Sequence, residues 1–112
     1  MNTDSFPGVT PQDPLVEILP DLFLLRGSIK LAPGLSIGRN MVVIRDGDEL
    51  TLVGSVRMTP ENEARVEDIG RVTNLVRIGL HGLDDAYTVS RFGCRFWCLA
   101  GTERTLGAAA SR

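Results

Sequence analysis

The segment His81-Gly-Leu-Asp-Asp85 holds three residues that could bind a metal ion, namely His81, Asp84 and Asp85. Imidazole and carboxylate groups are common zinc ligands, and a catalytic zinc takes three protein ligands and a water. Asp84 and Asp85 are adjacent at the start of a predicted helix, so their side chains point about 100° apart. His81 is the only histidine, which excludes any site that needs several imidazoles.

The same segment has two interpretations without a metal. In the first it is the capped start of a helix, in which the Asp84 carboxylate accepts a hydrogen bond from the backbone N–H of Ala86 or Tyr87. Asp85 then interacts with the helix dipole, and His81 is a loop residue with a packing role. In the second interpretation His81 and Asp85 form an acid–base pair. The residues alone leave all three interpretations open.

The two cysteines, Cys94 and Cys98, lie in an aromatic and apolar run that is typical of a strand. Four strand residues span about 13 Å, whereas a disulfide needs Cα atoms within about 7 Å. We therefore expect two free thiols that pack as small apolar groups, in a reducing cytoplasm.

Other motifs point to no chemistry. The segment Gly34-Leu-Ser-Ile-Gly38 lacks the lysine of a phosphate-binding loop, and neither Ser55 nor Ser90 lies in the Gly-x-Ser-x-Gly pattern of a hydrolase nucleophile. Three arginines are expected on a solvated face: Arg71, Arg77 and Arg91.

The composition limits the chain to one core. It has 112 residues, 43% of them hydrophobic and 23% charged, with a formal net charge of −2. Because there is no basic block, we do not expect nucleic acid as a partner. The apolar runs, such as 41–44, are far too short for a membrane span, so we expect none, and the first residues predict no signal peptide.

The chain divides into a flexible lead-in over 1–14, a single α+β domain over 15–100 and a loose tail over 101–112. Short apolar runs at 15–19 and 22–25 predict strands on either side of Pro20-Asp21. Residues 28–40 contain Pro33-Gly34 and Gly38, which favours a loop or an irregular β-excursion.

The clearest local signals follow. Residues 41–53 predict a hairpin that turns at Asp46-Gly47, with a first strand that is apolar on both faces and should be covered on both. Thr59-Pro60 starts a helix that ends at Gly70, and a strand over 72–78 completes a β-α-β crossover. A second helix over 84–92, closed by Gly93, leads to a strand over 95–99.

Over residues 15–100, this order of elements together with His81-Gly-Leu-Asp-Asp-Ala86 resembles the N-terminal half of the metallo-β-lactamase-like hydrolase superfamily. That superfamily carries a His-x-His-x-Asp-His motif that binds one or two zinc ions. On this chain His81 matches the first histidine and Asp85 the aspartate, whereas Leu83 and Ala86 stand at the other histidines. Gly54 stands where the family usually has an aspartate. The resemblance therefore implies a degenerate metal motif.

The resemblance implies an α+β fold: a mixed β-sheet with two short helices, which is half of an αβ/βα sandwich. It also implies a non-catalytic or truncated domain without a cofactor, which works as an association module. The alternative is a weak single-metal hydrolase centred on His81, with zinc held by His81, Asp84 and Asp85. Because a half sandwich leaves one sheet face uncovered, we expect a homo-oligomer, most simply a symmetric dimer, or a missing C-terminal half as the partner.

Overall fold

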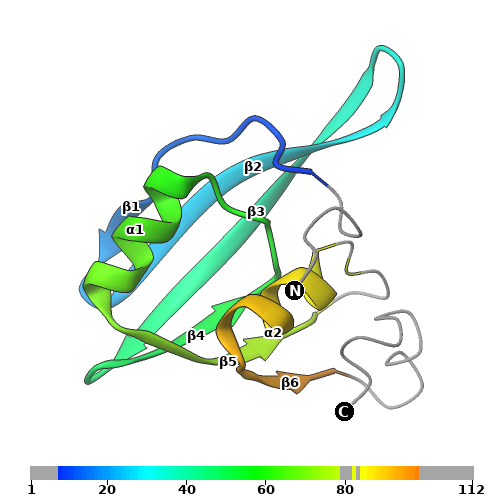
Figure 1. Ribbon diagram of the computed structural model, residues 1–112. Coiled ribbons are helices and arrows are strands. Elements are labelled where there is room, and N and C mark those ends of the chain that lie inside the picture. The colour runs from blue at the N-terminus through cyan, green and yellow to red at the C-terminus, as the bar shows by residue number, and fades with distance from the viewer. Residues whose placement is uncertain (1–7, 79–81, 83, 99–112) are drawn as a thin grey trace.

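The strands of this protein lie across one sheet in the order in which they occur in the chain. The computed structural model describes residues 8–78, 82 and 84–98 (Figure 1). Its elements in chain order are β1 (Val16–Leu19), β2 (Leu22–Ala32), β3 (Leu35–Asp46), β4 (Glu49–Val53), α1 (Pro60–Ile69), β5 (Arg71–Val76), α2 (Asp85–Phe92) and β6 (Arg95–Trp97). The predicted α+β class with a mixed sheet and two short helices is confirmed.

The two predicted crossovers are confirmed. Strands β1 to β4 pair antiparallel, whereas β4 pairs with β5 and β5 with β6 in parallel. Each parallel pair is joined through a helix, and both crossovers step in the same direction across the sheet. Crossovers of one hand that step in one direction place their helices on the same face. Helices α1 and α2 therefore form a single layer (Figure 1).

The ends of the helices follow their local signals. Thr59 precedes Pro60, and its hydroxyl accepts a hydrogen bond from the backbone N–H of Asn62 at 3.2 Å. Gly70 ends α1 with its N–H donated to the carbonyl of Val66. Gly93 ends α2 in the left-handed region at φ 65°, which glycine adopts without a steric penalty.

Residues 28–40 differ from the prediction of a loop or irregular excursion. They belong to the long hairpin of β2 and β3, which stay paired from Leu22–Ile44 to Ala32–Leu35 and turn at Pro33-Gly34, with Gly34 at φ 77°. The far end of this hairpin projects beyond the rest of the sheet (Figure 1). The glycines suggested a break in the strand, but backbone pairing continues along the whole hairpin, with one shift of register between Lys30 and Ala32.

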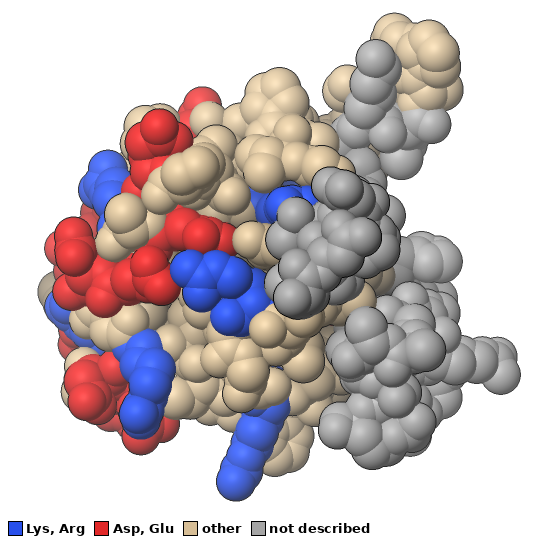
Figure 2. Space-filling model, in the orientation of Figure 1, with Lys and Arg blue, Asp and Glu red and all other residues tan. Residues whose placement is uncertain are grey.

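The core lies between the sheet and the helix layer. Its fully buried side chains come from alternate positions of the strands and from α1, and include Leu25, Met41, Val43, Leu50, Leu52, Val66 and Leu75. From α2, Val89 and Phe92 pack against this cluster. On the outer surface of the helix layer, charged side chains gather over α1 (Figure 2). The helix layer thus has one apolar side on the core and one charged side in water.

The opposite face of the sheet has no layer on it among the described residues. Met41 and Val43 of β3 are fully buried, but Ile44 on the other face is 42% exposed. The described elements cover only one face of this strand, because both helices lie on the same side. The predicted cover of the other face stays a prediction.

Residues 8–14 carry no regular element, yet several of them are attached to the domain. The side chain of Gln12 donates to the carbonyl of Arg57 at 3.0 Å and accepts from the backbone N–H of Thr59 at 2.8 Å. The N–H of Asp13 donates to the carbonyl of Arg26 at 2.8 Å. The domain limits at 15 and 100 stay a prediction. In the described part of the chain, neither helix is long and apolar enough to span a membrane.

Candidate functional site

Asp84 lies where α2 begins, but its carboxylate does not cap the helix. One carboxylate oxygen, Oδ2, accepts from the backbone N–H of Arg57 at 2.8 Å and from the Arg39 guanidinium at 3.3 Å. The predicted hydrogen bond to Ala86 or Tyr87 is therefore wrong. The carboxylate instead turns toward β3 and the segment after β4, where a guanidinium and a backbone donor meet. Asp84 thus joins three parts of the chain.

Asp85, the first residue of α2, forms a buried ion pair with Arg77, which directly follows β5. The Arg77 Nε donates to Asp85 Oδ2 at 2.7 Å, and the two side chains are only 2% and 1% exposed. The Arg77 guanidinium also lies over the Phe96 ring, 5.2 Å from its centroid. Burial raises the pKa of Asp85 above its ordinary value of 3.8, whereas the hydrogen bond and charge of Arg77 act against this rise. The prediction that Arg77 lies on a solvated face is wrong.

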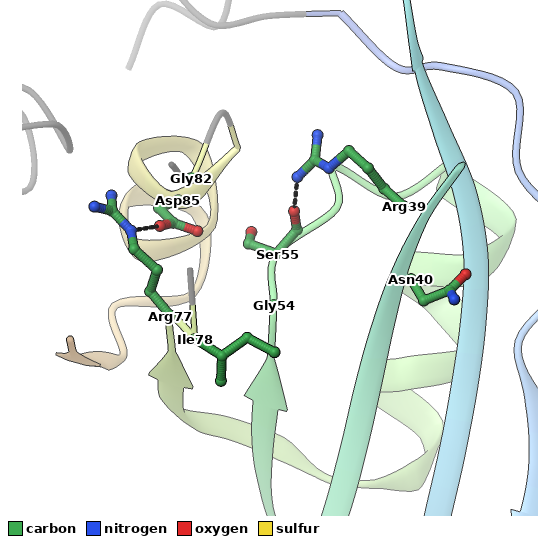
Figure 3. A pocket seen from close by; sticks show the side chains of 8 residues that line it. All are labelled: Arg39, Asn40, Gly54, Ser55, Arg77, Ile78, Gly82 and Asp85. Atoms are coloured by element: carbon green, nitrogen blue, oxygen red, sulfur yellow. Dashed lines mark hydrogen bonds and ion pairs between the residues drawn. The ribbon is translucent and has the colours of Figure 1, made fainter. Parts of the chain in front are cut away.

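Ser55, which sequence reasoning set aside, lies at the centre of the same region. Its hydroxyl donates to the backbone carbonyl of Asp84 at 3.2 Å and is in hydrogen-bond contact with the hydroxyl of Thr88 on α2. Its backbone carbonyl accepts from the Arg39 guanidinium (Figure 3). The hydroxyl therefore holds the end of β4 against the start of α2, and it does not have the exposure of a nucleophile.

A small hollow opens beside these groups. It has a volume of about 140 Å³, and Figure 3 shows its lining: Arg39, Asn40, Gly54, Ser55, Arg77, Ile78, Gly82 and Asp85. Gly82 is required here because a Cβ at this position would overlap the Asp85 carboxylate. Gly54, at φ 74°, turns the chain at the end of β4. The hollow thus lies at the edge of the sheet where the parallel strands end.

The charges of this site balance internally. The guanidinium groups of Arg39 and Arg77 pair with the carboxylates of Asp84 and Asp85, respectively. A divalent cation is favoured by uncompensated carboxylates, and here each carboxylate already has a cationic partner. Among the described residues, no group of three His, Cys, Asp or Glu side chains is placed to hold a metal. Asp84 and Asp85 therefore fit a metal poorly.

His81 lies outside the described residues, so its predicted part in the site stays a prediction. Sequence reasoning found Asp84 and Asp85 but missed Arg39, Ser55 and Arg77. The sequence carries no signal for these partners, because the burial of the two carboxylates is known only from the structure. The two cysteines are free, as predicted, and Cys94 is buried.

The uncovered sheet face carries a continuous line of apolar residues, which we call the apolar row. One residue of each strand lies in register with the next across all six strands: Val16, Leu24, Val42, Val53, Val76 and Trp97. Val16 and Trp97 at its ends are each 52% exposed. Beside the row, Ile18 and Ile44 are 48% and 42% exposed. Soluble proteins rarely leave such a patch in water.

Comparison with solved structures identifies the fold. The metallo-β-lactamase FIM-1 from Pseudomonas aeruginosa in its mono-zinc form superposes with a TM-score of 0.67 at 13% identity, over 89% of this chain and 47% of that one. The chain has the fold of half a metallo-β-lactamase. Two further metallo-β-lactamases have the same fold. The one from Hirschia baltica has a TM-score of 0.66 and 16% identity, over 86% of this chain and 47% of that one. The one from Erythrobacter litoralis has a TM-score of 0.66 and 13% identity, over 82% of this chain and 43% of that one.

The chain spans about half the length of these metallo-β-lactamases. At this level of identity the likeness establishes the fold and not the activity. No protein-family model matches the chain, and no curated protein matches it either. The predicted resemblance to half of a metallo-β-lactamase-like fold is therefore confirmed in structure.

Proposed function

We propose that this chain is a non-catalytic association module of the metallo-β-lactamase-like fold, and that a second copy of the chain covers its open sheet face. The observation that carries the proposal is the apolar row on a face that no described element covers. Sheets pack face to face at about 10 Å through apolar side chains of this kind. The module therefore completes its sandwich by association.

The size of the face supports a stable contact. The row crosses five strand spacings of about 4.8 Å, or about 24 Å in all. With its apolar neighbours it offers on the order of 500 Å² per copy, and burial of that area is worth about 12 kcal/mol before the costs of association. Two copies together bury on the order of 1,000 Å², which is at the lower end for a specific interface.

The polar groups around the start of α2 support a non-catalytic role. The carboxylates at the start of α2 are paired with arginines, and the Ser55 hydroxyl is buried in contacts with the helix. A degenerate metal motif fits this arrangement, because its groups are used to attach α2 to the sheet. The two free cysteines agree with a cytoplasmic location, which we include in the proposal.

The experiment compares two substitutions on one strand. Ile44→Asp places a carboxylate on the open face, and Ile37→Asp places one on the opposite side of β3, at a residue of similar exposure (42% and 47%). By sedimentation velocity at micromolar concentration, we expect the wild type and Ile37→Asp to be dimers and Ile44→Asp to be a folded monomer by circular dichroism. A monomeric wild type would overturn the proposal and would favour a separate C-terminal half as the partner.

A further inference from the structure

Polar and apolar side chains are unevenly distributed on the open face of the sheet. Beside the apolar row, on the side toward the start of β4, the outward-facing residues change from apolar to polar between β3 and β4: Ile18, Leu22, Ile44, Thr51, Asn74 and Arg95. On the other side of the row this order is reversed. Arg26 and Asn40 lie there on β2 and β3, whereas Ile78 follows the end of β5.

These residues form two pairs of opposite corners. Ile78 is 75% exposed and lines a hollow of about 370 Å³ together with Trp97 of the row, so it belongs to the same face. We call the corners around Ile18 and Ile78 the apolar corners, and the corners around Arg26 and Arg95 the polar corners. Each pair lies on one diagonal of the face.

Aligned strands would bring unlike corners together. A symmetric pair of face-to-face sheets has its two-fold axis in the plane between them. An axis along the strands reverses the strand order, so the corner at Ile18 lies on the partner's corner at Arg95. An axis along the row reverses the strand direction, so the corner at Ile18 lies on the partner's corner at Arg26. Both arrangements press apolar side chains against polar and charged ones, which are costly to bury without partners.

An axis along either diagonal brings apolar corners onto apolar corners. From Leu22 on β2 to Ile78 after β5, the apolar diagonal crosses three strand spacings, about 14 Å, and four residues along the strands, about 13 Å. It therefore lies at about 45° to the strands. A two-fold axis at this angle turns the strands of the second copy by twice as much, to a crossing of about 90°. Near-perpendicular crossing is one of the two usual ways in which sheets pack face to face.

The twist of the sheet favours the same contact. A sheet with the normal twist is saddle-shaped, so two opposite corners bend toward a given face and the other two bend away from it. Figure 1 views the sheet from the helix side, with β1 at the left and β6 at the right. Right-handed crossovers give this arrangement when β4 points upward. On the open face, the twist then brings the apolar corners forward and carries the polar corners back.

On the basis of the association proposed above, we infer that the second copy lies with its strands crossed at about a right angle and contacts the first along the apolar diagonal. The two sheets approach each other at the corners around Ile18 and Ile78. They separate at the polar corners, where Arg26 and Arg95 stay in water. The interface is therefore a diagonal band and not the whole face of the sheet.

Cysteine cross-linking distinguishes crossed from aligned strands. Ile18→Cys and Ile78→Cys are made in a Cys98→Ser background, which removes the thiol that lines the hollow beside Ile78. With a short bifunctional methanethiosulfonate, we expect Ile18→Cys to be linked either to itself or, in a mixture, to Ile78→Cys. Both links indicate crossed strands, because Ile18 then meets its own corner or the opposite apolar corner of the partner.

Arg95→Cys and Arg26→Cys in the same background test the aligned arrangements. A link from Ile18→Cys to Arg95→Cys would place the axis along the strands, and a link to Arg26→Cys would place it along the row. Either link would overturn the crossed arrangement but leave the dimer intact. A dimer that is linked in none of these samples would overturn it too, because Ile18 meets an apolar corner in both crossed forms. A wild type that sediments as a monomer would overturn the association itself.

The dissociation constant of the dimer gives an independent readout. Ile18→Asp places a charge inside the diagonal band and should raise the dissociation constant at least about tenfold by sedimentation equilibrium. The matched control is Arg95→Ser, on the same side of the row but at a polar corner, which should change the dissociation constant by less than about twofold. An Arg95→Ser variant that dissociates as readily as Ile18→Asp would contradict the crossed arrangement, because Arg95 is covered only when the strands are aligned.

Discussion

Arg77 and Asp85 stand eight residues apart in the chain and meet through a hydrogen-bonded ion pair of 2.7 Å that is almost completely removed from water. Arg77 follows the last residue of β5, and Asp85 is the first residue of α2. The pair therefore fixes the start of the helix to the end of the strand, across a connection that includes residues outside the described part of the chain.

Asp85→Asn should destabilise the fold by about 3 to 5 kcal/mol, because it removes the carboxylate charge that pairs with the buried Arg77 guanidinium. The matched control is Asp21→Asn, since Asp21 pairs with Arg45 at the same 2.7 Å but is 58% exposed. The control should cost no more than about 1 kcal/mol. Urea unfolding of both variants measures the difference, and equal losses would contradict the importance of burial.

Because the pKa of Asp85 is raised in the folded chain, its contribution to stability should depend on pH. Between the ordinary value of 3.8 and the raised folded-state pKa, the folded chain keeps a proton on Asp85 that the unfolded chain releases. The contribution of Asp85 to the free energy of unfolding therefore falls as the pH rises from 3.8 through the folded-state pKa. In urea titrations across this range, the stability difference between wild type and Asp85→Asn should shrink with rising pH. A difference that grows would mean that Arg77 outweighs burial.

Gly82→Ala should destabilise the fold by about 1 to 3 kcal/mol, the usual cost of inserting a methyl group into a packed site. The new Cβ would overlap the Asp85 carboxylate and lie 2.8 Å from Arg77 Nε. Gly8→Ala is the control, because a Cβ at Gly8 meets no atom within 4 Å. Thermal melts decide the matter, and two unchanged melting temperatures would show that the pair can move aside.

Zinc should bind the purified chain weakly and below one equivalent, and His81→Ala should change neither the fold nor the melting temperature appreciably, with a loss of at most about 1 kcal/mol. The reason is that Asp84 and Asp85, the proposed co-ligands, already pair with arginines. Titration calorimetry with zinc on wild type and His81→Ala checks this. Tight one-to-one binding that His81→Ala abolishes would restore the single-metal hydrolase as the better function.

Sequence patterns predicted the elements whose causes are local. The cap at Thr59 and the helix end at Gly70 each depend on residues close by in the sequence, and both are confirmed. The hairpin predicted to turn at Asp46-Gly47 is also present, but its turn lies one residue later, at Gly47-Asp48. The long hairpin of β2 and β3 was missed because its regularity comes from pairing between the strands and not from either strand alone.

The polar contacts at the start of α2 were out of reach for a similar reason. Asp84 was predicted to bind its own helix, but its partners come from Arg39 and Arg57, far away in the sequence. Arg77 was predicted to lie on a solvated face, because its burial depends on the packing of α2 and cannot be seen in the sequence. The apolar row could not be seen at all, since it exists only when the register of every strand pair is known.

The strand order has a consequence for the way the chain acquires its structure. Each strand pairs with the strand that precedes it in the sequence, so every new element finds its neighbour already in place. Short separations between contacting residues favour fast folding, and growth from the N-terminus suits a chain that folds while it is synthesised. In the described part of the chain, β6 is the last strand, and it contains Trp97. A nascent chain therefore completes the apolar row only when β6 pairs with β5, because every earlier strand is synthesised before it.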